Sequence, residues 1–121
     1  MRNVSAVVLI LAVVLAGTTV AGAHAFLERA DPRVGSTVRT SLAEVRLWLS
    51  ENLESAFSSV QVINAAGQRV DKGDHHVDPA TPSLLRISLQ PLELGTYKVI
   101  WRVLPVDAHV TEGDFTFRVT R

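Results

Sequence analysis

Hydrophobic and polar residues alternate one by one over most of the chain that follows residue 24. A period of two sends successive side chains to opposite faces, so each alternating stretch predicts a β-strand with one buried face. The two most regular stretches cover residues 97–104 and 114–120, and shorter ones cover residues 44–49, 59–62 and 85–89. No stretch of useful length has the 3.6-residue period of an amphipathic helix. The pattern therefore predicts an all-β domain.

Turn-forming residues separate these alternating stretches. Asp-Pro, Ala-Gly and Leu-Gly pairs stand at 31–32, 66–67 and 94–95. Such pairs interrupt regular structure because Gly and Pro restrict or free the backbone in ways that strands do not tolerate. Six or seven short strands at this spacing, in about a hundred residues, are typical of a two-sheet antiparallel sandwich. Residues 70–83 lack periodicity and are rich in Asp, Gly, Pro and His, which predicts a long surface loop.

One apolar segment near the start does not follow the alternating pattern. Residues 6–16 are uninterrupted apolar residues, Arg2 precedes them, and an Ala-Gly-Ala triplet follows at 21–23. A positive start, a short apolar run and a small-x-small exit describe a secretory signal peptide. The alternative, an uncleaved membrane anchor, needs a longer apolar run. We therefore expect a cleaved helical signal peptide over residues 1–23 and one exported domain over residues 24–121.

The composition limits the chemistry that this domain can use. Lys and Arg number 12, and so do Asp and Glu, so the chain has no excess positive charge to neutralise phosphates, and nucleic acid is not an expected partner. The chain has no cysteine, and Met1 is its one methionine. These absences exclude disulfides, iron–sulfur clusters, thiolate zinc sites and a thiol nucleophile. A metal would have to be held by nitrogen and oxygen.

Cleavage before His24 would create a metal-chelating group at the new N-terminus. A terminal histidine offers its free α-amine and its imidazole Nδ1, which together close a chelate ring on a metal ion. The Ala-His-Ala triplet at 23–25 provides a second cleavage position, after which the chain would begin at Phe26 and lose this group. The cleavage position therefore decides whether the chelate exists.

Asp107 and His109 form the second candidate group, one residue apart between the two most regular predicted strands. If the backbone is extended there, both side chains leave the same face and point together. The alternative is a solvated turn after Pro105. The position at one end of a sandwich, where the N-terminal strand could arrive, favours the functional interpretation, because an amine, two imidazoles and a carboxylate would then converge.

Such a donor set favours borderline metal ions in tetragonal geometry. At equal access the affinity of nitrogen and oxygen sites peaks at copper(II), whereas copper(I) prefers the sulfur that this domain lacks. Nickel(II) is the closest competitor. Zinc fits the ligand types, although structural zinc sites usually include cysteine or more histidine.

At this point the sequence resembles the CopC family, copper-binding proteins of the bacterial periplasm, nearly from end to end of the domain. Residues 24–36 contain His-Ala-x-Leu followed by Pro-x-x-Gly-Ser, and residues 49–53 read Leu-Ser-Glu-Asn-Leu. Residues 95–103 read Gly-Thr-Tyr-Lys-Val-x-Trp-Arg-Val and lead through Asp107-x-His109 to Phe-x-Phe-x-Val at 115–119. The closing stretch is long and specific.

The resemblance implies an Ig-like, cupredoxin-like Greek-key β-sandwich that binds one copper(II) ion and catalyses no reaction. His24 would supply an amine and an imidazole, His109 a second imidazole and Asp107 a carboxylate, with Glu51 near the site as an orienting or weak axial group. The resemblance further implies copper homeostasis or resistance, a periplasmic location and exchange of copper with a CopD-like membrane transporter. We expect a monomer.

Several alternatives stay open from the sequence alone. The methionine-rich loop of some CopC-like proteins is absent, and the adjacent His75 and His76 offer at most an accessory site, because neighbouring side chains point to opposite sides of an extended chain. An N-terminal histidine with a second histidine also resembles the copper grip of lytic polysaccharide monooxygenases. A metal-free Ig-like interaction module is the third interpretation. The aromatic residues are expected to pack in or near the core, with Trp101 at most lining the site: Trp48, Tyr97, Trp101, Phe115 and Phe117.

Overall fold

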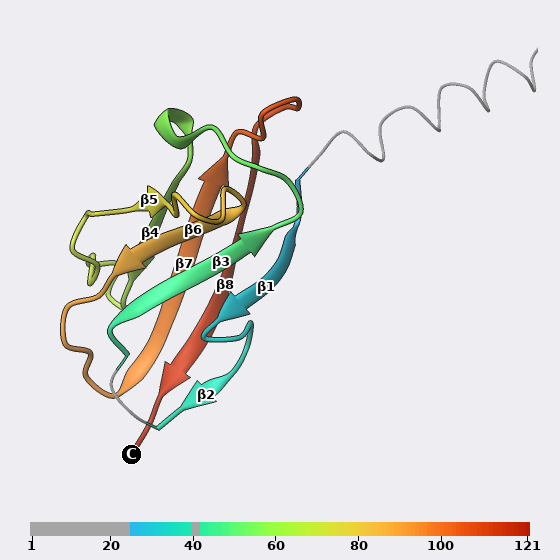
Figure 1. Cartoon of the computed structure of the whole chain (residues 1–121). Helices are drawn as coiled ribbons and strands as arrows, with labels where there is room; N and C mark the ends of the chain where they lie inside the picture. Colours follow the sequence, from blue (N-terminus) through green and yellow to red (C-terminus); the bar gives the residue numbers. More distant parts are fainter. Residues whose placement is uncertain (1–24, 40–41) are drawn as a thin grey trace, which may run out of the picture.

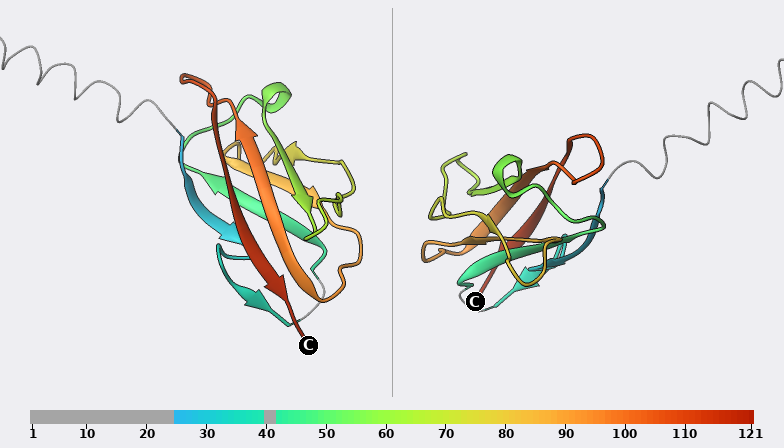
Figure 2. Two further views of the ribbon diagram at one scale, coloured as in Figure 1. Left: turned by 180° about the vertical axis from the view of Figure 1, so that it is seen from behind. Right: turned by 45° about the horizontal axis from the view of Figure 1, so that its top comes forward.

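The structure is a computed structural model that describes residues 25–39 and 42–121. It consists of two four-stranded sheets packed face to face (Figures 1 and 2). The first sheet has the order β1-β3-β6-β5, with β1 (Leu27–Asp31), β3 (Glu44–Leu49), β6 (Leu84–Ser88) and β5 (His76–Val77). The second has the order β2-β8-β7-β4, with β2 (Thr37–Val38), β8 (Thr111–Val119), β7 (Gly95–Val103) and β4 (Ser59–Ile63). A single 3₁₀ turn, η1 (Ser55–Phe57), precedes β4.

This strand order is that of an immunoglobulin-type sandwich, in which the first, second, fifth and fourth strands form one sheet and the third, sixth and seventh form the other. The prediction of an all-β Ig-like sandwich is therefore confirmed. One detail differs: β2 pairs with β8 in parallel, so the second sheet is mixed rather than purely antiparallel. The predicted signal peptide, residues 1–23, lies outside the described residues and stays a prediction. Within the described part of the chain, no helix is long and apolar enough to cross a membrane.

The core lies between the sheets and is built from the alternating positions of the strands. Val45, Leu47 and Leu49 of β3 are buried, as are Val60 and Val62 of β4. The expected aromatic residues of β7 and β8 are buried as well: Tyr97, Trp101, Phe115 and Phe117. Burial of apolar surface of this kind is the main stabilising contribution in a small domain.

Trp48 does not belong to this core, contrary to the sequence prediction. It stands on the outer face of the first sheet, half-buried, because its neighbours Leu47 and Leu49 take the inward positions of the strand. The guanidinium carbon of Arg29 lies 4.0 Å from the centre of the indole ring, and that of Arg46 lies 5.3 Å from it. Cation–π contact with two arginines therefore replaces core packing here.

Two contacts fix β7, the strand that leads to the candidate site. The hydroxyl of Tyr97 donates a hydrogen bond to the carbonyl oxygen of Glu93 at 2.6 Å, the tyrosine corner typical of this fold. Higher in the strand, Trp101 lies over Gly113 of β8, where an added Cβ would stand 2.6 Å from the indole. Glycine at 113 therefore lets the indole lie against the hairpin backbone.

Predicted boundaries differ from the observed ones in the connections. Residues 70–83 are not loop throughout, because His76 and Val77 form the edge strand β5 against β6. The two strands predicted at 97–104 and 114–120 begin earlier, at Gly95 and Thr111, because the hairpin ladder continues past the apolar alternation.

Candidate metal site at one end of the sandwich

Two segments that carry predicted site residues meet the first described residues of the chain at one end of the sandwich, the upper end in Figure 1. The three stretches are residues 25–26, residues 50–58 after β3, and residues 104–110 between β7 and β8. We call this end the tip. Its position follows from the fold, because β1 begins, β3 ends and β7 ends there.

Two hydrogen bonds, one to a side chain and one between backbone groups, tie the first described residues to the segment after β3. The Phe26 amide donates to Ser50 Oγ at 2.9 Å, and the Ser50 amide donates to the Phe26 carbonyl oxygen at 2.9 Å. Ala25, the residue that follows His24, is buried against the core. His24 itself lies outside the described residues, so its place as a ligand stays a prediction.

The same segment is hydrogen-bonded on its other side to the β7–β8 connection. The Val106 amide donates to the carbonyl oxygen of Asn52 at 3.0 Å, and the Glu54 amide donates to that of Leu104 at 2.8 Å. Residues 50–54 therefore bridge the N-terminal residues and the connection that bears Asp107 and His109, although these are about eighty residues apart in sequence. Sequence reasoning missed this bridge, because backbone hydrogen bonds leave no residue-type signal.

The backbone around Asp107 is a turn rather than the extended chain assumed from the Asp-x-His spacing. The Ala108 amide donates to the Pro105 carbonyl oxygen at 3.4 Å, which closes the turn. Asp107 and His109 are both exposed on it, so both remain accessible at the tip. The Thr111 hydroxyl donates to the carbonyl oxygen of His109 at 3.4 Å, where β8 begins.

The carboxylates at the tip take no part in the ion pairs that stabilise the described part of the fold. Glu51 and Asp107 are exposed, and among the described residues neither takes part in an ion pair. The described residues alone assemble no group of three His, Asp or Glu side chains suited to a metal ion. The tip brings Glu51, Asp107 and His109 to one end of the sandwich without forming such a group among the described residues.

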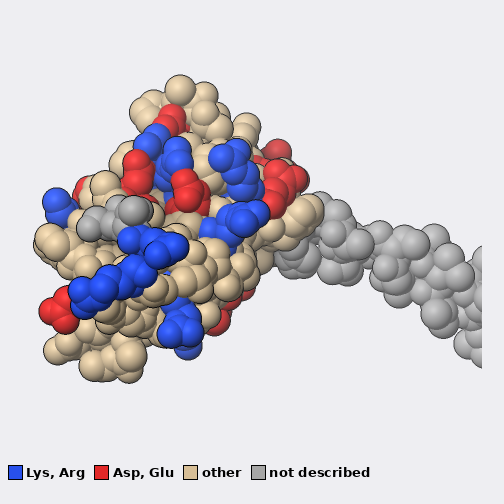
Figure 3. All heavy atoms as spheres, turned by 90° about the horizontal axis from the view of Figure 1, so that it is seen from below, with Lys and Arg blue, Asp and Glu red and all other residues tan. Residues whose placement is uncertain are grey.

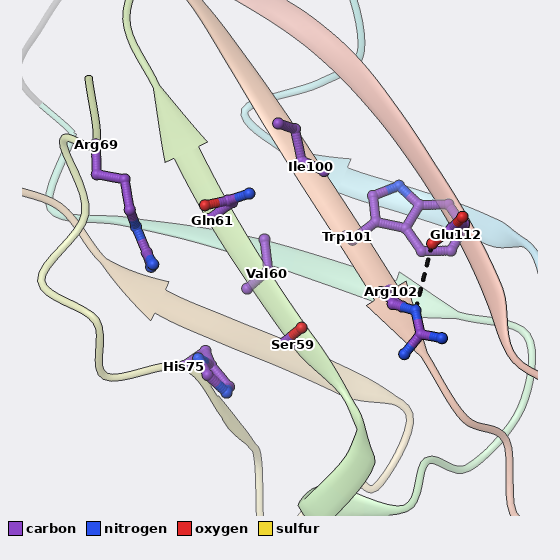
Figure 4. Close-up of a pocket in the computed structure, with 9 residues that line it drawn as sticks. All are labelled: Ser59, Val60, Gln61, Arg69, His75, Ile100, Trp101, Arg102 and Glu112. Atoms are coloured by element: carbon purple, nitrogen blue, oxygen red, sulfur yellow. Dashed lines mark ion pairs between the residues drawn. The ribbon is translucent and has the colours of Figure 1, made fainter. Parts of the chain in front are cut away.

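His75 and His76 lie away from the tip. His75 lines a hollow of about 390 Å³ on the outer side of β4, where Arg69 stands on the same side as His75 and Arg102 on the other (Figure 4). His76 Nδ1 lies 3.0 Å from the carbonyl oxygen of Asp74. Among the described residues no group of three His, Asp or Glu side chains surrounds either histidine, so the accessory site gains no support. Trp101 lines this hollow rather than the tip.

The acidic residues of the segment that bears these histidines are occupied by structural contacts. Asp71 is buried and accepts hydrogen bonds from the amides of Val62 at 2.8 Å and Gly73 at 2.9 Å, and from Arg69 at 2.7 Å. Burial alone would raise its pKa, but the Arg69 and backbone hydrogen bonds outweigh that cost and hold the pKa below its ordinary value. The negative charge of Asp71 is therefore part of the fold.

The outer face of the first sheet contains a second group of paired charges. Arg86 on the outer face of the first sheet contacts Glu44 at 2.8 Å and Asp78 at 2.8 Å, and these bonds lower the pKa of both carboxyl groups. Seen from the end opposite the tip, basic side chains gather with acidic ones between them (Figure 3). The tip differs, since its carboxylates stand without such partners.

Comparison with known proteins identifies relatives over nearly the whole described domain. The model of one family, described as the CopC domain, matches residues 27–120. Copper resistance protein C of Pseudomonas syringae pv. tomato is 33% identical over 110 residues, which cover 84% of this chain and 85% of that protein. The crystal structure of PcoC, a methionine-rich copper resistance protein from Escherichia coli, superimposes with a TM-score of 0.69 at 31% identity, covering 81% of this chain and 100% of that one.

A third relative is much longer. The copper transport protein CutJ of Bacillus subtilis is 25% identical over 98 residues, and these cover 80% of this chain but only 18% of CutJ. The names of these relatives describe copper resistance and copper transport, and none describes an enzyme. They agree with the expectation of a copper-binding protein rather than a monooxygenase.

Proposed function

The chain belongs to the CopC family of copper-binding proteins, and from that membership we propose that its tip binds one copper(II) ion outside the cytoplasm and exchanges it with a membrane copper transporter. The observation that carries the proposal is the hydrogen-bonded segment 50–54, which holds the N-terminal residues and the Asp107–His109 turn at the same end of the sandwich.

The proposed ligands are the α-amine and imidazole of His24, the imidazole of His109 and the carboxylate of Asp107. Residues 25 and 26 are anchored to Ser50, which supports a position for His24 close to the segment that carries Glu51. Glu51 would orient a ligand or bind weakly along the axis. The exposure and unpaired state of both carboxylates among the described residues leave them available for this role.

Copper(II) rather than copper(I) is the proposed oxidation state. PcoC is described as methionine rich, whereas this chain has no methionine after Met1 and no cysteine. Nitrogen and oxygen donors favour the oxidised ion, and copper(I) would lack the sulfur it prefers. Binding without redox turnover follows, so the protein buffers copper and hands it on.

The proposed location and partner rest on two further observations. The leader at residues 1–23 has the pattern of a cleaved signal peptide. CutJ joins a segment like this domain to a much longer copper transport protein, which supports a transporter of CopD type as the partner of the separate domain. We propose that the domain works as a monomer.

Titration of copper into the chain that begins at His24 tests this function. We expect one copper(II) ion per chain, an electron paramagnetic resonance spectrum with nitrogen hyperfine structure, and weaker binding of nickel(II) and zinc(II). Intact-mass measurement of the exported protein determines the first residue. No binding to the correctly processed chain, or an exported chain that begins at Phe26, would refute the proposed site.

A further inference from the structure

Large hydrophobic side chains are exposed at the tip. Phe26 is 61% exposed, Phe57 66%, Val106 52% and Val110 41%. Only two other large hydrophobic residues of the described chain are exposed to this degree, Val34 and Leu94, and both lie away from the tip. Exposed apolar residues that gather in one place mark interaction sites, whereas scattered ones need no explanation.

The four tip residues share one backbone framework. Phe26 is hydrogen-bonded to Ser50, Val106 to Asn52, and the Phe57 amide donates to the carbonyl oxygen of Glu54 at 3.1 Å. Val110 follows in the same β7–β8 connection. Phe57, Val106 and Val110 lie in residues 50–58 and 104–110, and Phe26 is hydrogen-bonded to Ser50, so all four are exposed at the end that carries the proposed copper ligands. We call the exposed face of these segments the tip surface.

The charge of the tip surface restricts what can cover it. The described residues of the tip contain three carboxylates, Glu51, Glu54 and Asp107, and no Lys or Arg. Basic residues lie at the opposite end of the sandwich: Arg118 of β8 stands opposite Thr37 of β2 in the strand register, and Arg121 follows β8. A second copy would bring two acidic tips together, and an anionic membrane would repel the tip. A basic partner surface with apolar side chains is complementary in both respects.

We propose that the tip surface is the docking site for a protein partner that presents apolar side chains among lysines and arginines. The inference deepens the proposed function, since it assigns the face through which copper would be exchanged. Phe57 is the expected anchor, because it is the most exposed of the four and belongs to η1, which supplies no proposed ligand.

The test uses the copper-free chain that begins at His24 and a defined probe, an amphipathic helical peptide of leucine and lysine. Backbone amide shifts are expected at Phe26, Phe57, Val106 and Val110 when the peptide is added. Phe57→Ser should weaken peptide binding about tenfold or more, since burying a phenylalanine contributes about that factor. Leu94→Ser is the matched control, 53% exposed at the other end, and should leave binding unchanged.

Four results would overturn the proposal. They are shifts centred on Val34 and Leu94, equal binding of a peptide in which glutamate replaces lysine, insertion of the tip into vesicles of zwitterionic lipid, and a tip-mediated dimer in sedimentation. Copper titration of Phe57→Ser keeps the two hypotheses apart. Unchanged copper affinity with lost peptide binding supports the docking site, whereas absence of copper binding in the unmodified chain refutes the proposed function alone.

Discussion

Two connections of this sandwich contain aspartate and histidine, and they use them differently. Between β4 and β6, Asp71 and Asp78 are bound to arginines and backbone amides, and the histidines there lie beside Arg69 or on the edge strand. Between β7 and β8, Asp107 stands exposed on a turn that is closed by backbone hydrogen bonds. Aspartate therefore stabilises the fold in one connection and remains available for a ligand in the other.

The difference shows why residue type is a poor guide to a metal site. A carboxylate that already accepts hydrogen bonds from an arginine and two amides can bind a cation only by giving these up. A carboxylate that the fold does not use loses only water. Availability, rather than the presence of Asp and His, separates the tip from the β4–β6 connection.

The largest effect should come from replacing one histidine in each connection by alanine and comparing the copper affinities of the two variants. His109→Ala is expected to lower copper affinity by about a hundredfold or more, above the loss typical of an outer-shell partner. His76→Ala should leave it within about twofold, since the nearby carboxylates of Asp74 and Glu44 already accept hydrogen bonds from the Ser88 amide and from Arg86. A copper competition titration measures both. Equal losses in the two variants would remove the distinction between the connections.

The aspartates should separate stability from binding. Asp71→Ala is expected to lower the free energy of unfolding by about 2 kcal/mol or more, because it leaves the Val62 and Gly73 amides without their acceptor. Its copper affinity should not change. Asp107→Ala should do the reverse, with an unfolding transition like that of the unmodified protein and weaker copper binding. Urea unfolding with copper titration of both variants decides; a destabilised Asp107→Ala would contradict the comparison.

The two connections should also respond differently to acid. The pKa of Asp71 is lowered in the folded state, so its stabilising contribution is complete above the ordinary pKa of 3.8 and is lost as pH falls through the lower folded value. Asp71→Asn should flatten the acid side of the stability profile of the metal-free protein. Copper affinity should also fall as pH is lowered, but this fall should begin at a higher pH than the loss of stability, because the ligands must lose protons to bind. If the stability of the metal-free protein and the copper affinity were lost at the same pH midpoint, the two pH dependences would not arise from different residues.

The smallest effect is expected at the hollow beside β4. Arg102 and Glu112 form a surface ion pair at 3.4 Å with both side chains more than 60% exposed. Arg102→Gln should change the free energy of unfolding by less than about 1 kcal/mol and leave copper affinity unaltered. A thermal melt and the same copper titration suffice. A marked loss of copper affinity would extend the functional region beyond the tip.

The fold could be predicted from the sequence because the alternation of apolar and polar residue types marks the buried and exposed faces of each strand. Trp48 is the exception, since its aromatic type favours the core whereas its place between Leu47 and Leu49 in the alternation puts it on the outer face, where two arginines contact the ring. The site could be predicted only as residue identities at 24, 107 and 109. The bridge through Ser50 and Asn52 depends on backbone hydrogen bonds between segments distant in sequence, which no residue pattern encodes.

The N-terminal chelate is the central claim, and one comparison tests it directly. Copper affinity is measured by competition for the chain that begins at His24 and for the same chain with one alanine added in front. The added residue moves the free amine away from the imidazole but leaves every side chain in place. We predict that copper affinity falls by orders of magnitude while the thermal unfolding of the metal-free protein stays the same. Equal affinity in the two chains would contradict the proposed site.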